Sequence, residues 1–216
     1  MKKEKRRMRK VLWGFIYAAT FIVVFIVSVI FKLSSDPTHG ACKVDWNDSV
    51  GTVHTDFTYG AGEANKFDLY LPADNSRDNY GLVVYLHAGG FTVGDKSEDA
   101  EMLKWLCSKG YVAAGINYTL RTDTNTASVN SMSEEIRDSI PIIIEETKKL
   151  GYSIDKMAVA GGSAGHALAM IYAYRDAKQS PVPVVLTFGA VGPASFYQED
   201  WAAASKRLER LVSACF

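Results

Sequence analysis

The sequence predicts an α/β fold, a three-layer αβα sandwich with a mostly parallel sheet, preceded by one transmembrane helix. Short apolar runs with little alternation recur between residues 81 and 188, and such runs are typical of strands covered on both faces. Segments of helical length separate the runs, and this alternation implies right-handed crossovers between parallel strands. The first ten residues are basic and the next 21 are apolar and uncharged, which sets them apart from the folded domain.

Local signals place the individual elements. In the predicted helix over 133–150, Ser131 and Glu134 have the spacing of a capping box, and Gly151 stands where a helix terminator belongs. Pro141 lies inside this helix, so we expect a kink there or a later start. The other predicted elements are strands over 81–87, 111–116, 157–160 and 182–188 and helices over 98–108, 164–177 and 200–212, the last of them amphipathic.

The main chemical signal is a Gly-x-Ser-x-Gly pattern, Gly161 to Gly165, directly after an apolar run. A serine held on a sharp strand-to-helix turn presents its hydroxyl outward, as a nucleophile requires. Bulkier residues at Gly161 and Gly165 would clash with the neighbouring strand and helix. We therefore expect Ser163 to be a catalytic nucleophile on an elbow that these two glycines permit.

Four segments resemble, in order, motifs of the α/β-hydrolase superfamily, in its carboxylesterase and lipase-like branch. They are FDLYLP at 67–72, HAGGF at 87–91, NYTL at 117–120 and GGSAG at 161–165. The resemblance covers roughly residues 53–194. It departs from the family in two places, because Ala88 replaces the first glycine of the family's His-Gly-Gly-Gly loop and Thr119 stands where arginine is frequent.

The resemblance implies acyl transfer at Ser163, whose hydroxyl would attack a substrate carbonyl. The N–H of Ala164 and an N–H from Ala88 or Gly89 would hold the oxyanion that develops. Donors fixed in advance at that point lower the barrier, and losing one costs about 3 to 4 kcal/mol. The implied substrate is a small-molecule carboxylic ester, and no cofactor is implied.

The same resemblance places the acid and the histidine of a triad downstream of the serine. The four histidines are His39, His54, His87 and His166, and none follows Ser163 at such a distance. His166 falls in the first turn of the elbow helix and should point around it, and His87 is expected to bond local backbone. The acidic residues after the serine also miss the family position; they are Asp176, Glu199, Asp200 and Glu209.

We therefore interpret the chain as the N-terminal part of a longer serine hydrolase, without the acid and histidine of its triad. Negligible ester turnover is expected from these 216 residues alone. Two alternatives stay open. One is a catalytically inactive fragment or pseudoenzyme that acts as a binding module, and the other is a peptidase or acyltransferase of the same fold.

The N-terminus predicts a membrane anchor. Residues 1–10 hold seven Lys or Arg against one Glu, and residues 11–31 are uncharged and apolar, long enough at about 1.5 Å each to cross about 30 Å of hydrocarbon. The basic flank predicts a cytoplasmic N-terminus and an extracytoplasmic hydrolase domain in a single-pass protein of the cell membrane. The predicted organisation is a basic tail at 1–10, a signal anchor at 11–31, a linker at 32–50 and the hydrolase domain at 51–216.

Composition argues against other partners. The 24 basic and 24 acidic residues balance, and the part behind the basic flank is mildly acidic, which gives no reason to expect nucleic acid. Cys42, Cys107 and Cys215 show no metal-binding spacing, so no metal is expected. Cys107 is expected to be a small buried residue, and a pairing of Cys42 with Cys215 stays open.

Overall fold

The computed structural model describes residues 2–34 and 43–193, which fall into two units divided after Lys43. The first unit holds a single helix, α1 (Lys2–Ser34). Its stretch Leu12–Phe31 is 20 residues long and apolar enough to cross a membrane, and a signal sequence near an N-terminus has the same character. The predicted helix over 200–212 lies outside the described residues.

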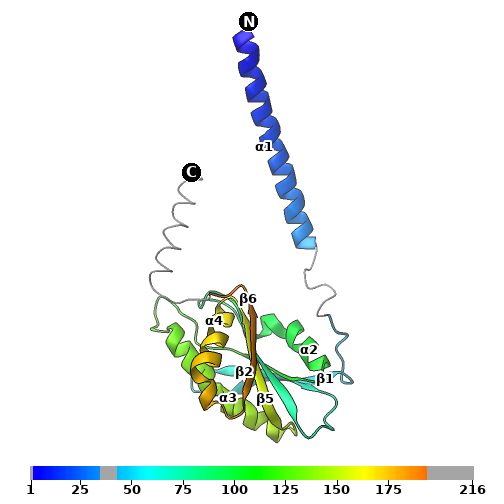
Figure 1. The fold of residues 1–216 in the computed structure, drawn as a ribbon, viewed down its shortest axis with the longest axis vertical. Helices are drawn as coiled ribbons and strands as arrows, with labels where there is room; N and C mark the ends of the chain where they lie inside the picture. Colours follow the sequence, from blue (N-terminus) through cyan, green and yellow to red (C-terminus); the bar gives the residue numbers. More distant parts are fainter. Residues whose placement is uncertain (1, 35–42, 194–216) are drawn as a thin grey trace. The chain divides into compact units, whose positions relative to one another are not determined.

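The second unit is built on one six-stranded sheet in the order β1-β2-β4-β3-β5-β6 (Figure 1). Strands β4, β3, β5 and β6 run parallel, whereas β2 is antiparallel to both β1 and β4. The predicted mostly parallel sheet is therefore confirmed. The strands are β1 (Gly51–Thr58), β2 (Lys66–Pro72), β3 (Tyr80–Leu86), β4 (Val112–Ile116), β5 (Ile154–Gly162) and β6 (Val184–Ala190).

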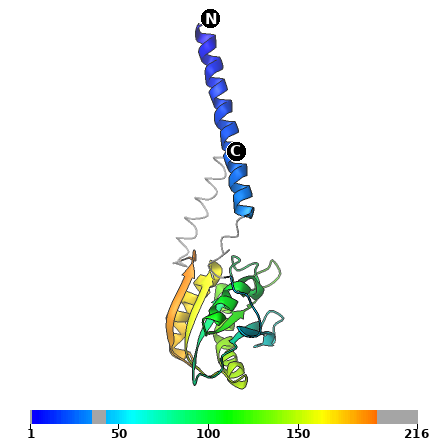
Figure 2. The ribbon, with the colours of Figure 1, turned by 90° about the vertical axis from the view of Figure 1, so that its right-hand side faces the viewer.

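Helices cover the two faces of the sheet unequally. The helices α3 (Val129–Lys149) and α4 (Ala164–Ile171) lie on one face, and α2 (Ala100–Ser108) lies on the other (Figures 1 and 2). The larger core cluster fills the α3 and α4 side and includes Leu82, Val84 and Val159, all fully or almost fully buried. A smaller cluster under α2 includes Leu103 and Ala113. This arrangement confirms the three layers.

The start of α3 differs from the prediction. The helix begins at Val129, because Ser128 is its N-cap and forms a capping box with Ser131. The Ser128 hydroxyl accepts from the Ser131 N–H at 3.1 Å, and the Ser131 hydroxyl accepts from the Ser128 N–H at 2.9 Å. The predicted box of Ser131 with Glu134 is wrong, since a second serine three residues upstream can cap equally well. Pro141 lies inside the helix, so a later start is also wrong.

Other differences lie at the ends of elements. Strand β6 ends two residues later than predicted, because its pairing with β5 continues as far as Ala190 opposite Gly162. The elbow helix is shorter than predicted, and a π-helical turn (Tyr172–Asp176) and a 3-10 turn (Ala177–Gln179) follow it. Strand β1 was not predicted, because most of it is half-buried or exposed and a register shift between His54 and Phe57 interrupts its pattern.

Candidate active site

Ser163 stands at the bend between β5 and α4. Its backbone has φ 49° and ψ −113°, a positive φ that a residue with a Cβ rarely adopts. The Ser163 N–H donates to the Ala190 carbonyl at 2.9 Å, so the end of β6 supports the bend. The half-buried side chain makes no hydrogen bond to another described residue. The bend thus presents this hydroxyl at the carboxyl ends of the parallel strands, where open α/β sheets bind ligands.

Close packing around the bend explains the two glycines. A Cβ at Gly161 would lie 2.7 Å from the Leu86 carbonyl oxygen and 2.6 Å from the oxygen of Gly165. A Cβ at Gly165 would overlap the Leu86 carbonyl and come within 2.6 Å of the His87 oxygen. The first turn of α4 therefore lies directly against the end of β3. This contact brings Ser163 beside the loop that leaves β3.

That loop is a tight turn. Gly89 has φ 123°, and its carbonyl accepts from the N–H groups of Thr92 at 3.1 Å and Val93 at 3.0 Å. A Cβ at Gly89 would overlap the Val93 carbonyl, so only glycine fits. The N–H groups of Ala88 and Gly89 donate to no described residue, and neither does that of Ala164 in the first turn of α4. Three donors are thus available next to the serine.

His87 supports the base of the loop. Its ring is buried and its Nδ1 lies 2.6 Å from the Ala88 carbonyl oxygen, an arrangement in which Nδ1–H donates to that carbonyl. Burial lowers the pKa of His87, although the bond to Ala88 opposes this. The neutral ring therefore ties the first two residues of the loop together, and the structure places the histidine in a supporting position.

The 117–121 segment follows β4 and forms hydrogen bonds to the loop at three points along its length. The Tyr118 hydroxyl donates to the His87 carbonyl at 3.0 Å, and the Arg121 N–H donates to the Phe91 carbonyl at 2.8 Å. Asn117 accepts from the Lys96 N–H at 2.7 Å and donates to the Asp95 carboxylate at 2.7 Å. The loop is therefore fixed at its beginning, middle and end by one neighbouring segment.

The segment is itself anchored to helix α3. The Thr119 N–H and hydroxyl donate to the two oxygens of Glu135 at 2.6 and 2.7 Å. Thr119 is the position at which the resembled family frequently has arginine. In this chain a hydroxyl and a backbone amide both donate to the carboxylate.

A buried ion cluster lies directly after the loop. The Lys96 ammonium is 2.8 Å from the carboxylate of Asp68 on β2 and 3.0 Å from that of Asp56 in the β1 bulge. Lys96 and Asp68 are buried, whereas Asp56 is exposed. Burial alone would lower the pKa of Lys96, but the two carboxylates raise it above its ordinary value. The lysine therefore stays charged and joins the loop to the antiparallel edge of the sheet.

The described histidines do not reach Ser163. The His166 ring lies against Gly189 and Gly192 at the end of β6, and its Nδ1 is buried without a described partner. His54 lies on β1 with its Nε2 3.4 Å from the Thr52 hydroxyl. Asp176 is the last residue of the π-helical turn that follows α4, and it pairs with Arg175 at 2.7 Å. His39, Glu199, Asp200 and Glu209 lie outside the described residues.

Several of these supporting residues could not be singled out from sequence. Asn117 belongs to a recognised motif, but its role depends on two partners more than twenty positions upstream. Lys96 and Asp68 are ordinary charged residues until the sheet brings them together. Within the described ranges, no group of three or more His, Cys, Asp or Glu side chains is arranged to hold a metal ion.

Solved structures share this architecture. The chain superposes on esterase B from Lactobacillus rhamnosis with a TM-score of 0.59 and 19% identity, over 80% of this chain and 58% of that one. Vibralactone cyclase gives a TM-score of 0.59 at 17% identity, over 80% and 52%. The architecture of this chain is therefore that of the α/β-hydrolase fold.

A family model identifies the chain more specifically than the fold does. Residues 67–196 match the BD-FAE family, and the chain belongs to it. Kynurenine formamidase from Salmo salar is 33% identical over 129 residues, which are 59% of this chain and 41% of that protein. The Danio rerio kynurenine formamidase is 31% identical over 125 residues, 57% and 40% of the two chains. The chain thus spans about two fifths of the length of these curated relatives.

Proposed function

We propose that this chain carries the nucleophile and oxyanion donors of a serine hydrolase that cleaves small carboxylic esters through an acyl-serine. The observation that supports it is the strained bend at Ser163, next to the N–H groups of Ala88, Gly89 and Ala164, which donate to no described residue. A strained backbone of this kind persists only where the surroundings enforce it, and such sites are frequently functional.

In this proposal the Ser163 oxygen bonds to the ester carbonyl carbon as a base removes the hydroxyl proton. The carbonyl oxygen becomes an oxyanion, which the backbone donors stabilise. Collapse of the intermediate breaks the ester bond, the alcohol leaves with a proton from the conjugate acid of the base, and water later releases the carboxylic acid. The base and its orienting acid are assigned outside the described residues, since no described histidine forms a hydrogen bond to Ser163.

A formamide is the second candidate substrate class. Both curated relatives are called kynurenine formamidase, and this chain matches about two fifths of the length of each. Amide and ester hydrolysis use the same nucleophile and oxyanion donors and differ in the leaving group, an amine instead of an alcohol. Side-by-side turnover of matched ester and N-formyl substrates distinguishes the two classes once the complete site is assembled.

Fluorophosphonate labelling tests the nucleophile directly. The purified chain in detergent should acquire one phosphonyl adduct, which peptide mapping places on Ser163. The variant Ser163→Ala should lose the adduct, whereas Ser180→Ala, which changes a serine after the elbow helix, should keep it. An adduct on another serine, or none after prolonged exposure at high pH, would contradict the proposal.

We further propose that α1 anchors the protein with its N-terminus in the cytoplasm. The support is the apolar stretch Leu12–Phe31 behind a basic flank. A cysteine at the exposed position 75, in a chain with Cys42→Ser and Cys215→Ser, should react with a membrane-impermeant maleimide on intact cells. A cysteine at position 3 should react only after permeabilisation. The reverse pattern would overturn this orientation.

A further inference from the structure

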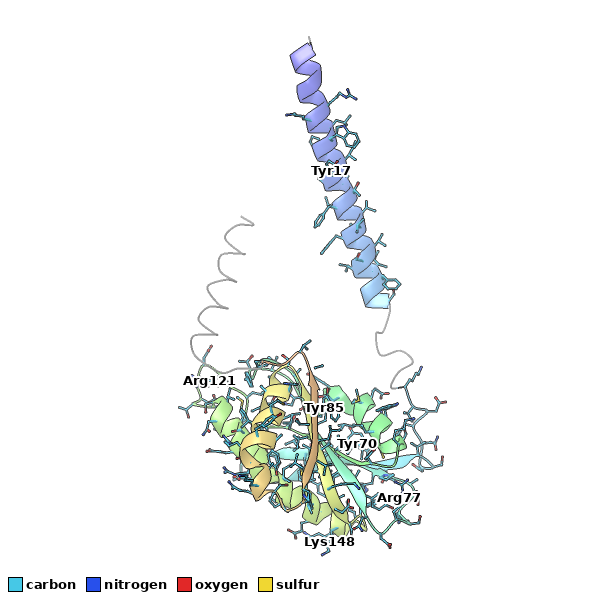
Figure 3. All side chains as sticks on the ribbon, in the orientation of Figure 1. Tyr17, Tyr70, Arg77, Tyr85, Arg121 and Lys148 are labelled. Atoms are coloured by element: carbon cyan, nitrogen blue, oxygen red, sulfur yellow. The ribbon has the colours of Figure 1, made fainter. Side chains whose placement is uncertain are left out.

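His166 follows the candidate nucleophile closely in the chain but faces a different strand. Successive residues of a helix point about 100° apart, so the first turn of α4 presents neighbouring side chains to different sides. Gly165 lies against the Leu86 carbonyl at the end of β3, whereas the His166 ring lies against the end of β6. Figure 3 labels Tyr85 near the carboxyl end of β3, where this elbow lies. The first turn of α4 thus contacts the ends of both strands that flank β5.

The backbone at the end of β6 packs tightly around the His166 ring. A Cβ at Gly189 would overlap the Nδ1 of His166, and a Cβ at Gly192 would overlap its Cβ, Cγ and Cδ2. At both positions the histidine therefore occupies the space that a side chain would take. The buried Nδ1 has no described hydrogen-bond partner, so the contact with β6 is one of packing.

Val191 lies between these two contacts in a strained conformation. Its φ is 49°, a value that is a genuine outlier for a β-branched residue. Its side chain is 93% exposed and contributes little packing of its own. A strained backbone persists only where its surroundings enforce it. The packing of His166 against Gly189 and Gly192, on either side of Val191, supplies such a constraint.

The end of β6 in turn supports the elbow. Gly162 pairs with Ala190 in register, and the Ser163 N–H donates to the Ala190 carbonyl at 2.9 Å. This hydrogen bond extends the pairing of β5 with β6 by one residue, as far as the bend. A displacement of the Ala190 carbonyl would free the Ser163 N–H and remove one restraint on the positive φ of the serine.

We propose that His166 is a positioning residue for Ser163. Its ring fixes the end of β6, and the Ala190 carbonyl then fixes the strained bend. This inference rests on the proposed role of Ser163 as the nucleophile. It assigns no proton transfer to His166, because a general base must lie within hydrogen-bond reach of the hydroxyl and no described hydrogen bond joins the two side chains.

Two substitutions at position 166 separate packing from proton transfer. His166→Ala removes the ring, whereas His166→Asn keeps a planar group with atoms in the places of Cγ, Nδ1 and Cδ2, which contact Gly189 and Gly192. In the full chain in detergent, amide hydrogen exchange at Ser163 should be about tenfold faster for His166→Ala and unchanged for His166→Asn. Exchange at Val159, in the buried middle of β5, should change in neither variant.

Fluorophosphonate labelling connects the exchange result to the nucleophile. If the wild-type chain is labelled at Ser163, His166→Ala should be labelled several times more slowly and His166→Asn at the wild-type rate. Failure to label the wild-type chain would contradict the proposed nucleophile. Hydrogen exchange needs no catalysis, so it tests the packing of His166 in either case.

Four results would overturn the inference. Unchanged exchange at Ser163 in His166→Ala would mean that the ring does not hold the bend. Equal acceleration at Ser163 in both variants would show that the contacts with Gly189 and Gly192 are not the cause. Equal acceleration at Ser163 and Val159 would indicate a general loss of stability. Slow labelling of His166→Asn with wild-type exchange would assign proton transfer to His166 instead.

Discussion

Tyr118 lies flat against His87, with ring centroids 4.4 Å apart and ring planes that differ by 5°, and its hydroxyl donates to the His87 carbonyl at 3.0 Å. The two residues follow β4 and β3, so the stacked rings join the ends of two parallel strands. Because the loop with Ala88 and Gly89 begins at His87, its orientation depends on this pair. Tyr118 and His87 thus support the candidate active site, although neither is a candidate catalytic residue.

Removal of the Tyr118 hydroxyl should weaken the support of the loop without creating a cavity in the core. Tyr118→Phe keeps the stacked ring and deletes one buried hydrogen bond, which contributes about 1 kcal/mol to the free energy of unfolding. We expect a loss of that size in urea denaturation, together with slower fluorophosphonate labelling of Ser163. Tyr111→Phe, at an exposed tyrosine, should change neither quantity. An unchanged unfolding midpoint for Tyr118→Phe would refute the role of the hydroxyl.

The elbow should not tolerate a methyl group at Gly165. Gly165→Ala places a Cβ on the Leu86 carbonyl, a backbone atom that cannot move without displacing β3. Overpacking in such a place costs about 3 kcal/mol or more, so the variant should unfold at a much lower temperature or fail to fold. Gly162→Ala is the matched control, because its Cβ would have no neighbour closer than 3.8 Å. Similar losses in thermal denaturation for both variants would show that backbone crowding is not the cause.

The elbow was predictable because its requirements are local. Gly161, Ser163 and Gly165 lie within five residues, and a bend of that kind demands small residues whatever surrounds it. The buried strands were predictable for the same reason, since parallel strands covered on both faces are apolar throughout. The ends of β6 and the start of α3 depend instead on pairing and on a choice between two serines, which composition does not decide.

The ion pairs and hydrogen bonds around the loop could be identified only from the folded structure. Lys96, Asp68 and Asp56 come from three separate elements, and only the antiparallel edge of the sheet brings them together. Strand β1 was missed because its bulge breaks the alternation by which a half-covered strand is recognised. In both cases the missing information is contact between distant segments.

Loss of the Lys96 cation should be costly. Lys96→Met leaves the buried carboxylate of Asp68 without its partner, and breaking a buried pair in this way costs about 3 to 5 kcal/mol. Lys104→Met breaks the more exposed pair with Glu101 and should cost less than about 1 kcal/mol. Urea denaturation of the two variants gives both values. If they agree within error, the Lys96 cluster does not stabilise the fold.

Removal of that carboxylate should restore part of the loss. Asp68→Asn combined with Lys96→Met removes the uncompensated charge, so the double variant should be more stable than Lys96→Met alone. Strictly additive losses would contradict a direct interaction between the two side chains.

The ionised carboxylate of Asp99, the residue before α2, should lower the free energy of unfolding in a pH-dependent way. Burial raises its pKa to about 6 from the ordinary 3.8, and its Oδ2 has no described partner. An acid whose pKa rises on folding binds its proton more tightly in the folded state. Its ionised form therefore costs stability above pH 6, and that cost disappears as the pH falls towards 3.8.

Asp99→Asn should accordingly stabilise the protein by about 1 to 2 kcal/mol at pH 8, allowing for the solvent contact that the side chain retains, and by almost nothing at pH 4. Asp78→Asn, at an exposed aspartate, should have little effect at either pH. Denaturation at the two pH values measures the difference. A gain from Asp99→Asn that is equal at pH 4 and pH 8 would mean that ionisation is not its origin.

An external base should reveal the nucleophile in this chain. Since the described histidines lie away from Ser163, the 216-residue polypeptide should turn over p-nitrophenyl esters negligibly. A serine hydroxyl is a weak nucleophile without a base, and imidazole in solution can take its proton. Imidazole should therefore accelerate acylation of Ser163, measured as the mass of the acylated peptide rather than as ester loss, because imidazole itself cleaves these esters. Ser163→Ala should remove the signal and Ser180→Ala should retain it. Rapid turnover without imidazole that disappears in Ser163→Ala would show instead that the chain already contains its base.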